Sequence, residues 1–444
     1  MPSANNEPTY NLKAVVRETA LKPDTLRVWE RRYGLPQPKR TAGGHRLYSR
    51  QDINILKWLV ARQQEGLSIS RAVKLWRQLE AEGKSPAAEK PYPGAFVARP
   101  GAVPATGQAL EQLCAAWIEA CVKFDEQAAE RILTQAFALY PAELTCTRLL
   151  MPALAEIGQG WYDGKYTVQQ EHFASALAIR RLEALLVATP APTRPERLII
   201  GCPPDEEHTL GPLLLSLLLR RQGLDVIYLG ANVPLEHFAG TVLTTRPQLI
   251  VLSAQRLPTA ASLQQMARLA VQQNVLLAFG GRIFNELPAL RRRIPGHFLG
   301  NNLNEAPRVV EHLLFAGAPE PTDIPPISEP YRQALEHYSA LQTSIDAAVR
   351  KNLRQASISE QQLSVAGYNV SRTIIAALTL GDVKFMGSEV EWASKLLVNH
   401  QLPPDLLCRY FEAYLQAAQE KLDQRGALVI TWLGQVVANC DELE

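Results

Sequence analysis

The stretch RLIIGCPPDEEHTLGPLLLSLLLRRQGLDVIYLG, residues 197–230, decides the fold at the centre of this chain. It begins and ends with short apolar runs bounded by turn residues, and a leucine-rich helical stretch lies between them. The same alternation continues with LIVLSAQ (249–255), VLLAFGG (275–281) and HFLG (297–300). Strands that alternate with helices indicate a doubly wound parallel α/β sheet, and such sheets bind ligands at the carboxyl ends of their strands.

The chain on both sides of this sheet has helical periodicity. Four amphipathic stretches with short connections predict a four-helix bundle before the sheet, and a Pro-rich segment precedes the bundle. We predict a multidomain protein: an all-α N-terminal module with a turn or small hairpin (1–83), a linker (84–106), the bundle (107–192), the α/β domain (193–318), a second linker (319–329) and an all-α C-terminal domain (330–444).

The composition excludes several classes of protein. Hydrophobic residues make up 47% and charged residues 20%, as in a globular protein with real cores. No apolar run reaches the roughly 18–20 residues of a membrane span, and the N-terminus does not resemble a secretory signal. The six cysteines form no C-x-x-C pair, which argues against a structural zinc site and a disulfide framework. We expect a cytoplasmic protein with no membrane partner.

Charge is distributed unevenly along the chain. Residues 1–83 contain 15 Lys and Arg against 8 Asp and Glu, a net charge of +7. The remainder contains 31 basic and 36 acidic residues, a net charge of −5. This asymmetry predicts that a surface for a polyanion lies in the N-terminal module.

The N-terminal module contains TLRVWERRYGLPQPKRTAGGHRLYS, residues 25–49. Arg27 and Arg31 are four apart, on one helix face that can enter a major groove, and further basic residues flank a glycine turn. The stretch resembles the winged helix-turn-helix of MerR-type regulators, which implies a double-stranded DNA operator. The DNA-contacting positions implied are Thr25, Arg27, Arg31, Arg32, Tyr33, Arg40, His45, Arg46 and Tyr48.

Such modules read DNA as pairs, so we expect a homo-oligomer, either a dimer or a tetramer. Many MerR-type proteins pair through a long coiled-coil helix after the wing. In this chain the Pro-rich segment stands in that place, and pairing must come from elsewhere.

The loop after the first predicted strand contains EEHTLG, residues 206–211. Its imidazole can give one neutral nitrogen to a metal while a carboxylate holds the other ring N–H. Taken alone, the motif is equally typical of a surface histidine on a loop. It resembles the D/E-x-H-x-x-G signature of cobalamin-binding domains, which implies that His208 is the lower cobalt ligand, supported by Glu206 and Gly211. Ser253, Gly280 and Gly281 match the family's positions around the nucleotide tail of the cofactor.

The fourth bundle stretch begins within WYDGKYTVQQEHFASA, residues 161–176. On its own this is a core tryptophan and a solvated acid–imidazole pair. In front of a cobalamin domain, W-x9-E-H resembles the signature of CarH-type light-sensing repressors. The resemblance implies that Trp161 and Glu171 surround the adenosyl group of adenosylcobalamin, and that His172 becomes the upper cobalt ligand after light. It also implies a photoreceptor without enzymatic turnover, in which photolysis breaks an oligomer and releases DNA.

Two other functions compete with a light-responsive repressor. One is a transcription factor that senses cobalamin without light. The other is a corrinoid methyl carrier, for which His208 would suffice, although the DNA-binding module argues against an enzyme. We find no catalytic residues: no nucleophile motif and no acid–base constellation is evident.

The C-terminal domain extends beyond the minimal CarH-type arrangement. It is either a packing or oligomerisation domain or a second chromophore site. The second hypothesis follows from a resemblance to the layout of photocobilin-type sensors, which implies a dual bilin and cobalamin photoreceptor with a second tetrapyrrole such as biliverdin. No specific motif supports it; the residues available for contact are His337, Tyr368, His400 and Cys408.

Overall fold

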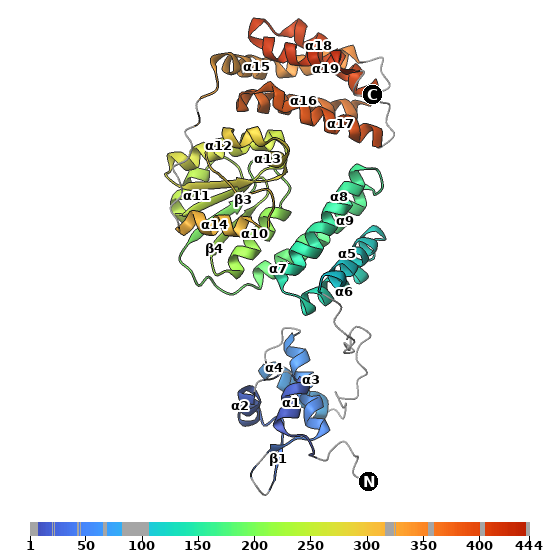
Figure 1. The fold of residues 1–444 in the computed structure, drawn as a ribbon, viewed down its shortest axis with the longest axis vertical. Helices are drawn as coiled ribbons and strands as arrows, with labels where there is room; N and C mark the ends of the chain where they lie inside the picture. The colour runs from blue at the N-terminus through green and yellow to red at the C-terminus, as the bar shows by residue number, and fades with distance from the viewer. Residues whose placement is uncertain are drawn as a thin grey trace. The chain divides into compact units, whose positions relative to one another are not determined.

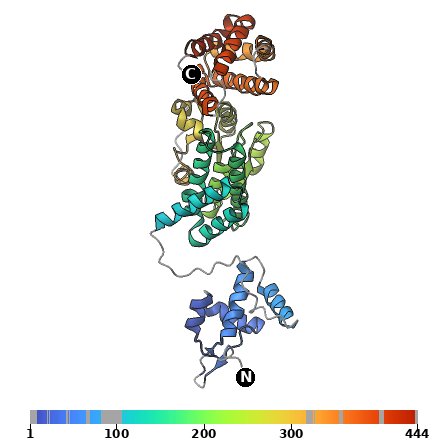
Figure 2. The same cartoon turned by 90° about the vertical axis from the view of Figure 1, so that its right-hand side faces the viewer.

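The structure is a computed structural model. It describes residues 8–19, 21, 23–41, 44, 46–64, 69–81, 106–315, 324, 326–353, 359–399 and 405–440. The chain divides into two compact units, residues 1–103 and 104–444 (Figures 1 and 2). Within the described parts, no helix has both the length and the apolar character that crossing a membrane requires.

The first unit is a small helical domain with a two-stranded wing. Its elements are α1 (Leu12–Thr19), α2 (Pro23–Tyr33), β1 (Lys39–Arg40), β2 (Arg46–Leu47), α3 (Arg50–Gln64) and α4 (Ile69–Ala81). The wing strands pair antiparallel. Leu26, Trp29, Leu56 and Trp76 are buried in its core. The predicted winged helix-turn-helix fold is therefore confirmed.

The second unit begins with the predicted four-helix bundle. Its helices are α5 (Thr106–Val122), α6 (Glu126–Leu139), α7 (Ala142–Thr145), which continues through the π-helical turn η1 (Cys146–Leu150) into α8 (Met151–Tyr162), and α9 (Val168–Val187). Thr167 and Gln170 form a capping box that fixes the start of α9. Trp117 and Leu177 of the bundle core share one apolar cluster with Leu213 and Leu217 of α10, so the bundle packs directly on the next domain.

That next domain is a parallel sheet of five strands in the order β4-β3-β5-β6-β7. The strands are β3 (Arg197–Gly201), β4 (Asp225–Gly230), β5 (Leu249–Ser253), β6 (Leu276–Gly280) and β7 (His297–Phe298). One face packs against α10 (Leu210–Arg221) and α14 (Ala306–Phe315), the other against α11 (Phe238–Thr245) and α12 (Leu257–Gln272). Because β4 and β5 lie on opposite sides of β3, the chain changes direction there, and the carboxyl ends of β3 and β5 form a crevice.

The C-terminal domain is helical, as predicted. Its helices are α15 (Glu329–Asn352), α16 (Glu360–Leu380), α17 (Gly387–Asn399), α18 (Asp405–Lys421) and α19 (Ala427–Ala438). The hydroxyl groups of Tyr338 and Tyr414 lie 2.5 Å apart in its core, and each lies 3.2 Å from Ser371 Oγ. Its apolar core is continuous with that of the sheet through α12, against which α16 packs. Short helical turns complete the unit: α13 (Arg282–Glu286), η2 (Pro288–Arg293), η3 (Val383–Met386) and η4 (Gln424–Gly426).

Candidate functional site

The loop that joins β3 to α10 carries the predicted histidine. The side chain of His208 is 63% exposed, whereas that of Glu206 is only 1% exposed. Nδ1 of His208 lies 2.5 Å from Oε1 of Glu206, and the His208 backbone N–H donates to the same oxygen (3.0 Å). The imidazole is thus oriented through Nδ1 by a buried carboxylate, and Nε2 is the nitrogen that Glu206 does not engage.

The second oxygen of Glu206 is also fully used. Oε2 accepts hydrogen bonds from the backbone N–H of Gln255 (2.7 Å) and from Oγ1 of Thr259 (2.6 Å). Burial opposes ionisation of this carboxyl group, but the hydrogen bonds from His208, Thr259 and Gln255 outweigh it and lower the pKa of Glu206 to about 2. An ionised carboxylate can only accept at Nδ1, so it favours the neutral tautomer that carries its proton there and offers the lone pair of Nε2 to a metal.

A cavity of about 300 Å³ lies at the carboxyl ends of β3, β5 and β6. It is lined by Gly201, Gly211, Ser253, Gly280 and Gly281 together with several apolar and amide side chains. Gly281 has a φ of +121°, and a Cβ there would lie 2.0 Å from the carbonyl oxygen of Ala254, so the backbone itself requires glycine. A Cβ on Gly211 would meet no protein atom within 4 Å. A side chain at position 211 would therefore extend into the cavity and would not clash with the protein.

The side chains available as metal ligands decide which kind of metal group this site can hold. No cluster of three or more His, Cys, Asp or Glu side chains that could hold a metal ion occurs among the described residues. One imidazole nitrogen beside a glycine-lined cavity therefore suits a metal that arrives already held by other ligands. The corrin ring of cobalamin holds its cobalt in this way, and its nucleotide tail requires a narrow slot. The residues present fit that cofactor.

Two predicted cofactor contacts lie in the first turn of α9. Nδ1 of His172 lies 2.6 Å from Oε2 of Glu171, whose Oε1 accepts from Ser175 Oγ (2.6 Å). The His172 side chain is 74% exposed and that of Glu171 28%. Trp161, partly buried, lies in the last turn of α8, so the α8–α9 connection brings all three residues to one end of the bundle. The His172–Glu171 pair repeats the arrangement of His208 and Glu206.

Contacts from the C-terminal domain reach both of these regions, which sequence reasoning missed. Arg372 Nη2 donates to Oδ2 of Asp205 (2.5 Å), next to Glu206 in the ligand loop. Asn399 Nδ2 donates to the carbonyl oxygen of Tyr162 (2.8 Å), and the rings of Tyr162 and Trp392 stack with centroids 6.1 Å apart. These residues are separated by 167 and 237 positions along the chain, and no local pattern marks such pairs.

In the first unit, α2 presents one basic face. Arg27, Arg31 and Arg32 are exposed, while Leu26 and Trp29 pack into the core on the opposite side. Arg40 is exposed in β1, and Nε of Arg46 pairs with Oε2 of Glu30 at 2.8 Å, which links the wing to α2. Basic side chains on a helix and an adjoining wing form a surface suited to a DNA groove and its phosphates.

Four predicted DNA contacts are not among these exposed or paired basic side chains. Tyr48 is a correction: its side chain is 1% exposed, packed in the core beneath the wing, and a buried phenol offers nothing to DNA. Tyr33 and Thr25 are half-buried, and Tyr33 packs against the core. His45 lies outside the described residues.

Of the tail residues considered for a second tetrapyrrole, the three that the structure describes do not converge. His337 Nε2 accepts from the Asp423 backbone N–H (3.2 Å), and Cys408 is buried with its thiol 3.7 Å from the carbonyl oxygen of Cys440. Tyr368 is 57% exposed and its hydroxyl accepts from Arg372 (2.7 Å). His400 lies outside the described residues. No described cavity is lined by any of these candidates.

Comparison with known proteins defines the class. Residues 10–79 match the MerR HTH family of regulatory proteins, and residues 113–186 and 196–301 match two B12 binding domain families. The chain is thus a MerR-type regulator with B12 binding domains. It is also similar to a solved monomethylamine corrinoid protein from Methanosarcina barkeri, at 17% identity and a TM-score of 0.39 over 46% of this chain and 99% of that one. This likeness is too distant to say more.

Two curated relatives place the chain within that class. It is 34% identical over 247 residues to the HTH-type transcriptional repressor CarH of Myxococcus xanthus, covering 56% of this chain and 79% of the relative. It is 32% identical over 252 residues to the repressor CarA of the same organism, covering 56% and 77%. The chain belongs to the family of CarH and CarA.

Proposed function

We propose that this protein is a cobalamin-dependent photoreceptor and transcriptional repressor. The observation that carries the proposal is the Glu206–His208 pair, which presents Nε2 of an oriented imidazole on a loop beside a glycine-lined cavity. In this function His208 would bind the cobalt, Glu206 would hold its tautomer, and Gly211, Ser253, Gly280 and Gly281 would accommodate the nucleotide tail. The repressor names of CarH and CarA support the regulatory part.

Operator binding would fall to the basic face of α2 and the wing. Arg27, Arg31 and Arg32 would enter the major groove while Arg40 and Arg46 contact phosphates. Two such readers in a dimer or tetramer gain affinity from linkage, so loss of the oligomer weakens DNA binding and relieves repression. No step of this function requires catalytic turnover.

The proposed signal is light acting on bound adenosylcobalamin. The cofactor supplies a cobalt–carbon bond that visible light breaks. Trp161 and Glu171 would enclose the adenosyl group from the bundle side in the dark. His172, whose exposed ring contacts Glu171 through Nδ1, would be the residue that can hold the cobalt through Nε2 when the adenosyl group is absent. The bundle would shift with it, and this two-state packing would control assembly.

The test uses full-length protein purified in the dark and supplied with adenosylcobalamin. Its absorption spectrum and its size by chromatography are recorded before and after green light. We expect both to change in the wild type, the His172→Ala variant to give a different spectrum after light, and the His208→Ala variant to lose affinity for the corrin. His312→Ala, on the exposed side of α14, is the control.

The remaining outcomes decide between the alternatives. Binding without any response to light would leave a light-independent cobalamin sensor. Absence of corrin binding would overturn the proposal altogether. A second tetrapyrrole in a dual bilin and cobalamin photoreceptor stays a prediction: His337, Tyr368 and Cys408, the described tail residues first considered for it, line none of the three cavities of about 560, 300 and 310 Å³.

A further inference from the structure

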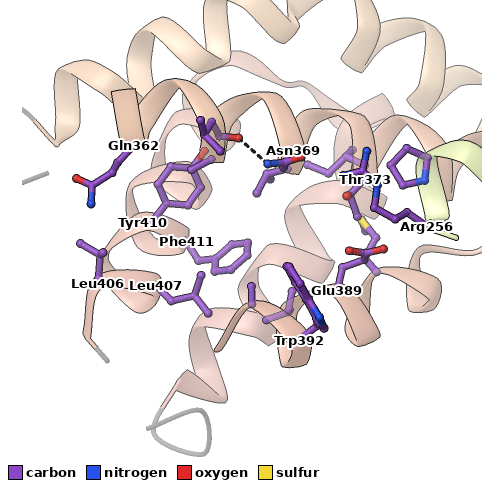
Figure 3. A pocket seen from close by; sticks show the side chains of 18 of the residues that line it. Arg256, Gln362, Asn369, Thr373, Glu389, Trp392, Leu406, Leu407, Tyr410 and Phe411 are labelled. Carbon is purple, nitrogen blue, oxygen red and sulfur yellow. Dashed lines mark hydrogen bonds between the residues drawn. The ribbon is translucent and has the colours of Figure 1, made fainter. Parts of the chain in front are cut away.

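The C-terminal domain contains a cavity of about 560 Å³ that the cobalamin proposal does not use (Figure 3). It lies among α16, α17 and α18, and its middle is apolar, lined by Phe411, Leu407 and Trp392. A cavity of this size falls within the roughly 300–1,000 Å³ typical of small-molecule sites. The lining therefore suits a molecule with a sizeable apolar body.

Two polar atoms of this cavity have no hydrogen-bond partner in the part of the chain that the structure describes. They are Nε of Arg256 and the hydroxyl oxygen of Tyr410, both buried, and the Tyr410 side chain is only 5% exposed. Figure 3 shows Arg256 at one end of the cavity and Tyr410 toward the other. Because a buried polar group without a partner destabilises the folded protein, such groups usually point to a ligand or to ordered water.

The charges at the Arg256 end favour an anion. Arg282, which also lines the cavity, pairs with Glu286 at 3.3 Å. The carboxylate of Glu389 accepts from the Leu257 backbone N–H (3.3 Å) at the start of α12, where the helix dipole also stabilises negative charge. Both neighbouring charges thus have partners, and no ion pair joins Arg256 to a described acidic residue. A guanidinium in this setting is suited to a carboxylate.

We propose that this cavity is a second ligand site, for an elongated and mostly apolar carboxylic acid. The carboxylate would lie at Arg256, the apolar body would run along Trp392, Leu407 and Phe411, and Tyr410 would hydrogen-bond to a polar atom at the far end. Long-chain fatty acids and open-chain tetrapyrroles share this chemistry. The proposal does not rest on the cobalamin function, because Arg256, Trp392, Leu407, Tyr410 and Phe411 have no part in it; of the lining residues, Arg282 also borders the glycine-lined cavity.

The binding test uses the full-length, cobalamin-loaded protein in the dark with two probes. One is cis-parinaric acid, a fatty acid that fluoresces in apolar surroundings, and the other is biliverdin, followed by its absorption band. At least one acid should bind, and Arg256→Met should weaken it tenfold or more. Arg268→Met, an exposed position on α12, the helix that begins directly after Arg256, should leave binding unchanged. Parinaryl alcohol, which lacks the carboxylate, should bind equally to the wild type and Arg256→Met.

Tyr410→Phe separates a ligand site from a merely structural tyrosine. Removing the unpartnered hydroxyl should raise the Tm of the protein without probe and reduce the rise in Tm that the probe produces. Binding of only one acid identifies the source of the ligand, and binding of both supports the shared chemistry. The proposal is overturned if neither acid binds, or if the bound acid ignores both Arg256→Met and Tyr410→Phe.

Discussion

Replacing Glu206 by glutamine should weaken both the binding of cobalamin and the stability of the folded protein. A glutamine fits the same space and can still accept from Gln255 and Thr259 through its carbonyl oxygen. Its amide group then faces Nδ1 of His208 as a donor, which favours the tautomer with the proton on Nε2. A protonated Nε2 has no lone pair for cobalt. We therefore expect Glu206→Gln to lose affinity for cobalamin by about 10–100-fold.

The structure also sets the size of the stability change. The pKa of Glu206 lies at about 2 against an ordinary value of 4.5. Since one pKa unit corresponds to about 1.4 kcal/mol, the folded protein favours the ionised carboxylate by roughly 3 kcal/mol. Because the folded pKa is lowered, this stabilisation is fully present above about pH 5 and is lost as the pH falls toward 2. Neutral glutamine should forfeit up to that amount at pH 7 and progressively less in acid.

The assay has two parts, with Glu207→Gln as the control because Glu207 is its exposed neighbour. Titration in the dark, followed by the visible spectrum, gives the Kd for adenosylcobalamin. Denaturant unfolding of the cofactor-free protein between pH 4 and 8 gives the stability difference from the wild type. The reasoning fails if Glu206→Gln binds cobalamin as tightly as Glu207→Gln, or if its stability deficit is the same at pH 4 as at pH 7.

Three further outcomes follow from individual contacts. Arg40→Ala should weaken binding to a random-sequence duplex and lower the slope of log affinity against log salt by about 0.9, measured by fluorescence anisotropy; an unchanged slope would mean that Arg40 touches no phosphate. Arg372→Met should raise amide hydrogen exchange in residues 203–208, because Asp205 loses its ion-pair partner. The control is Arg332→Met, which removes an exposed ion pair within α15 and should leave exchange in residues 203–208 unchanged. Trp392→Ala should speed proteolysis at the α8–α9 connection, because Tyr162 loses its stacking partner, and equal cleavage rates would count against that contact.

The sequence predicts those parts of the fold that follow from hydrophobic periodicity and from Gly and Pro residues at turns. The change of period at Arg197 identifies the sheet, and the EEHTLG loop lies where a strand ends and a helix begins. The pairing of His208 with Glu206 could be predicted as well, because both residues belong to one short loop. For this pair, closeness in the sequence and the resemblance to a family motif give the same prediction.

Other parts of the fold and the site depend on contacts between segments that are far apart in the sequence. Patterns within a single sequence do not reveal such contacts. Tyr48 follows basic residues and looks like part of the DNA surface, yet tertiary packing turns it into the core. Thr259 and Gln255 complete the hydrogen bonding of Glu206 from about 50 residues away, and only the parallel pairing of β3 with β5 brings them there. The cavity at Arg256 could not be predicted for the same reason, because its lining residues come from both the α/β domain and the C-terminal domain.

The C-terminal domain touches both parts whose relative position the proposed switch would change. Asp205 lies in the loop of the lower ligand, and Tyr162 lies at the end of the bundle beside Trp161. The ion pair to Arg372 is partly exposed and contributes about 0–1 kcal/mol, and the hydrogen bond and ring stack at Tyr162 contribute about 0.5–1.5 kcal/mol each. Breaking them costs about 1–4 kcal/mol, within the few kcal/mol that separate two conformations of a switch. A bundle that shifts must either break these contacts or carry the C-terminal domain with it, so that domain is placed to set the balance between the two states.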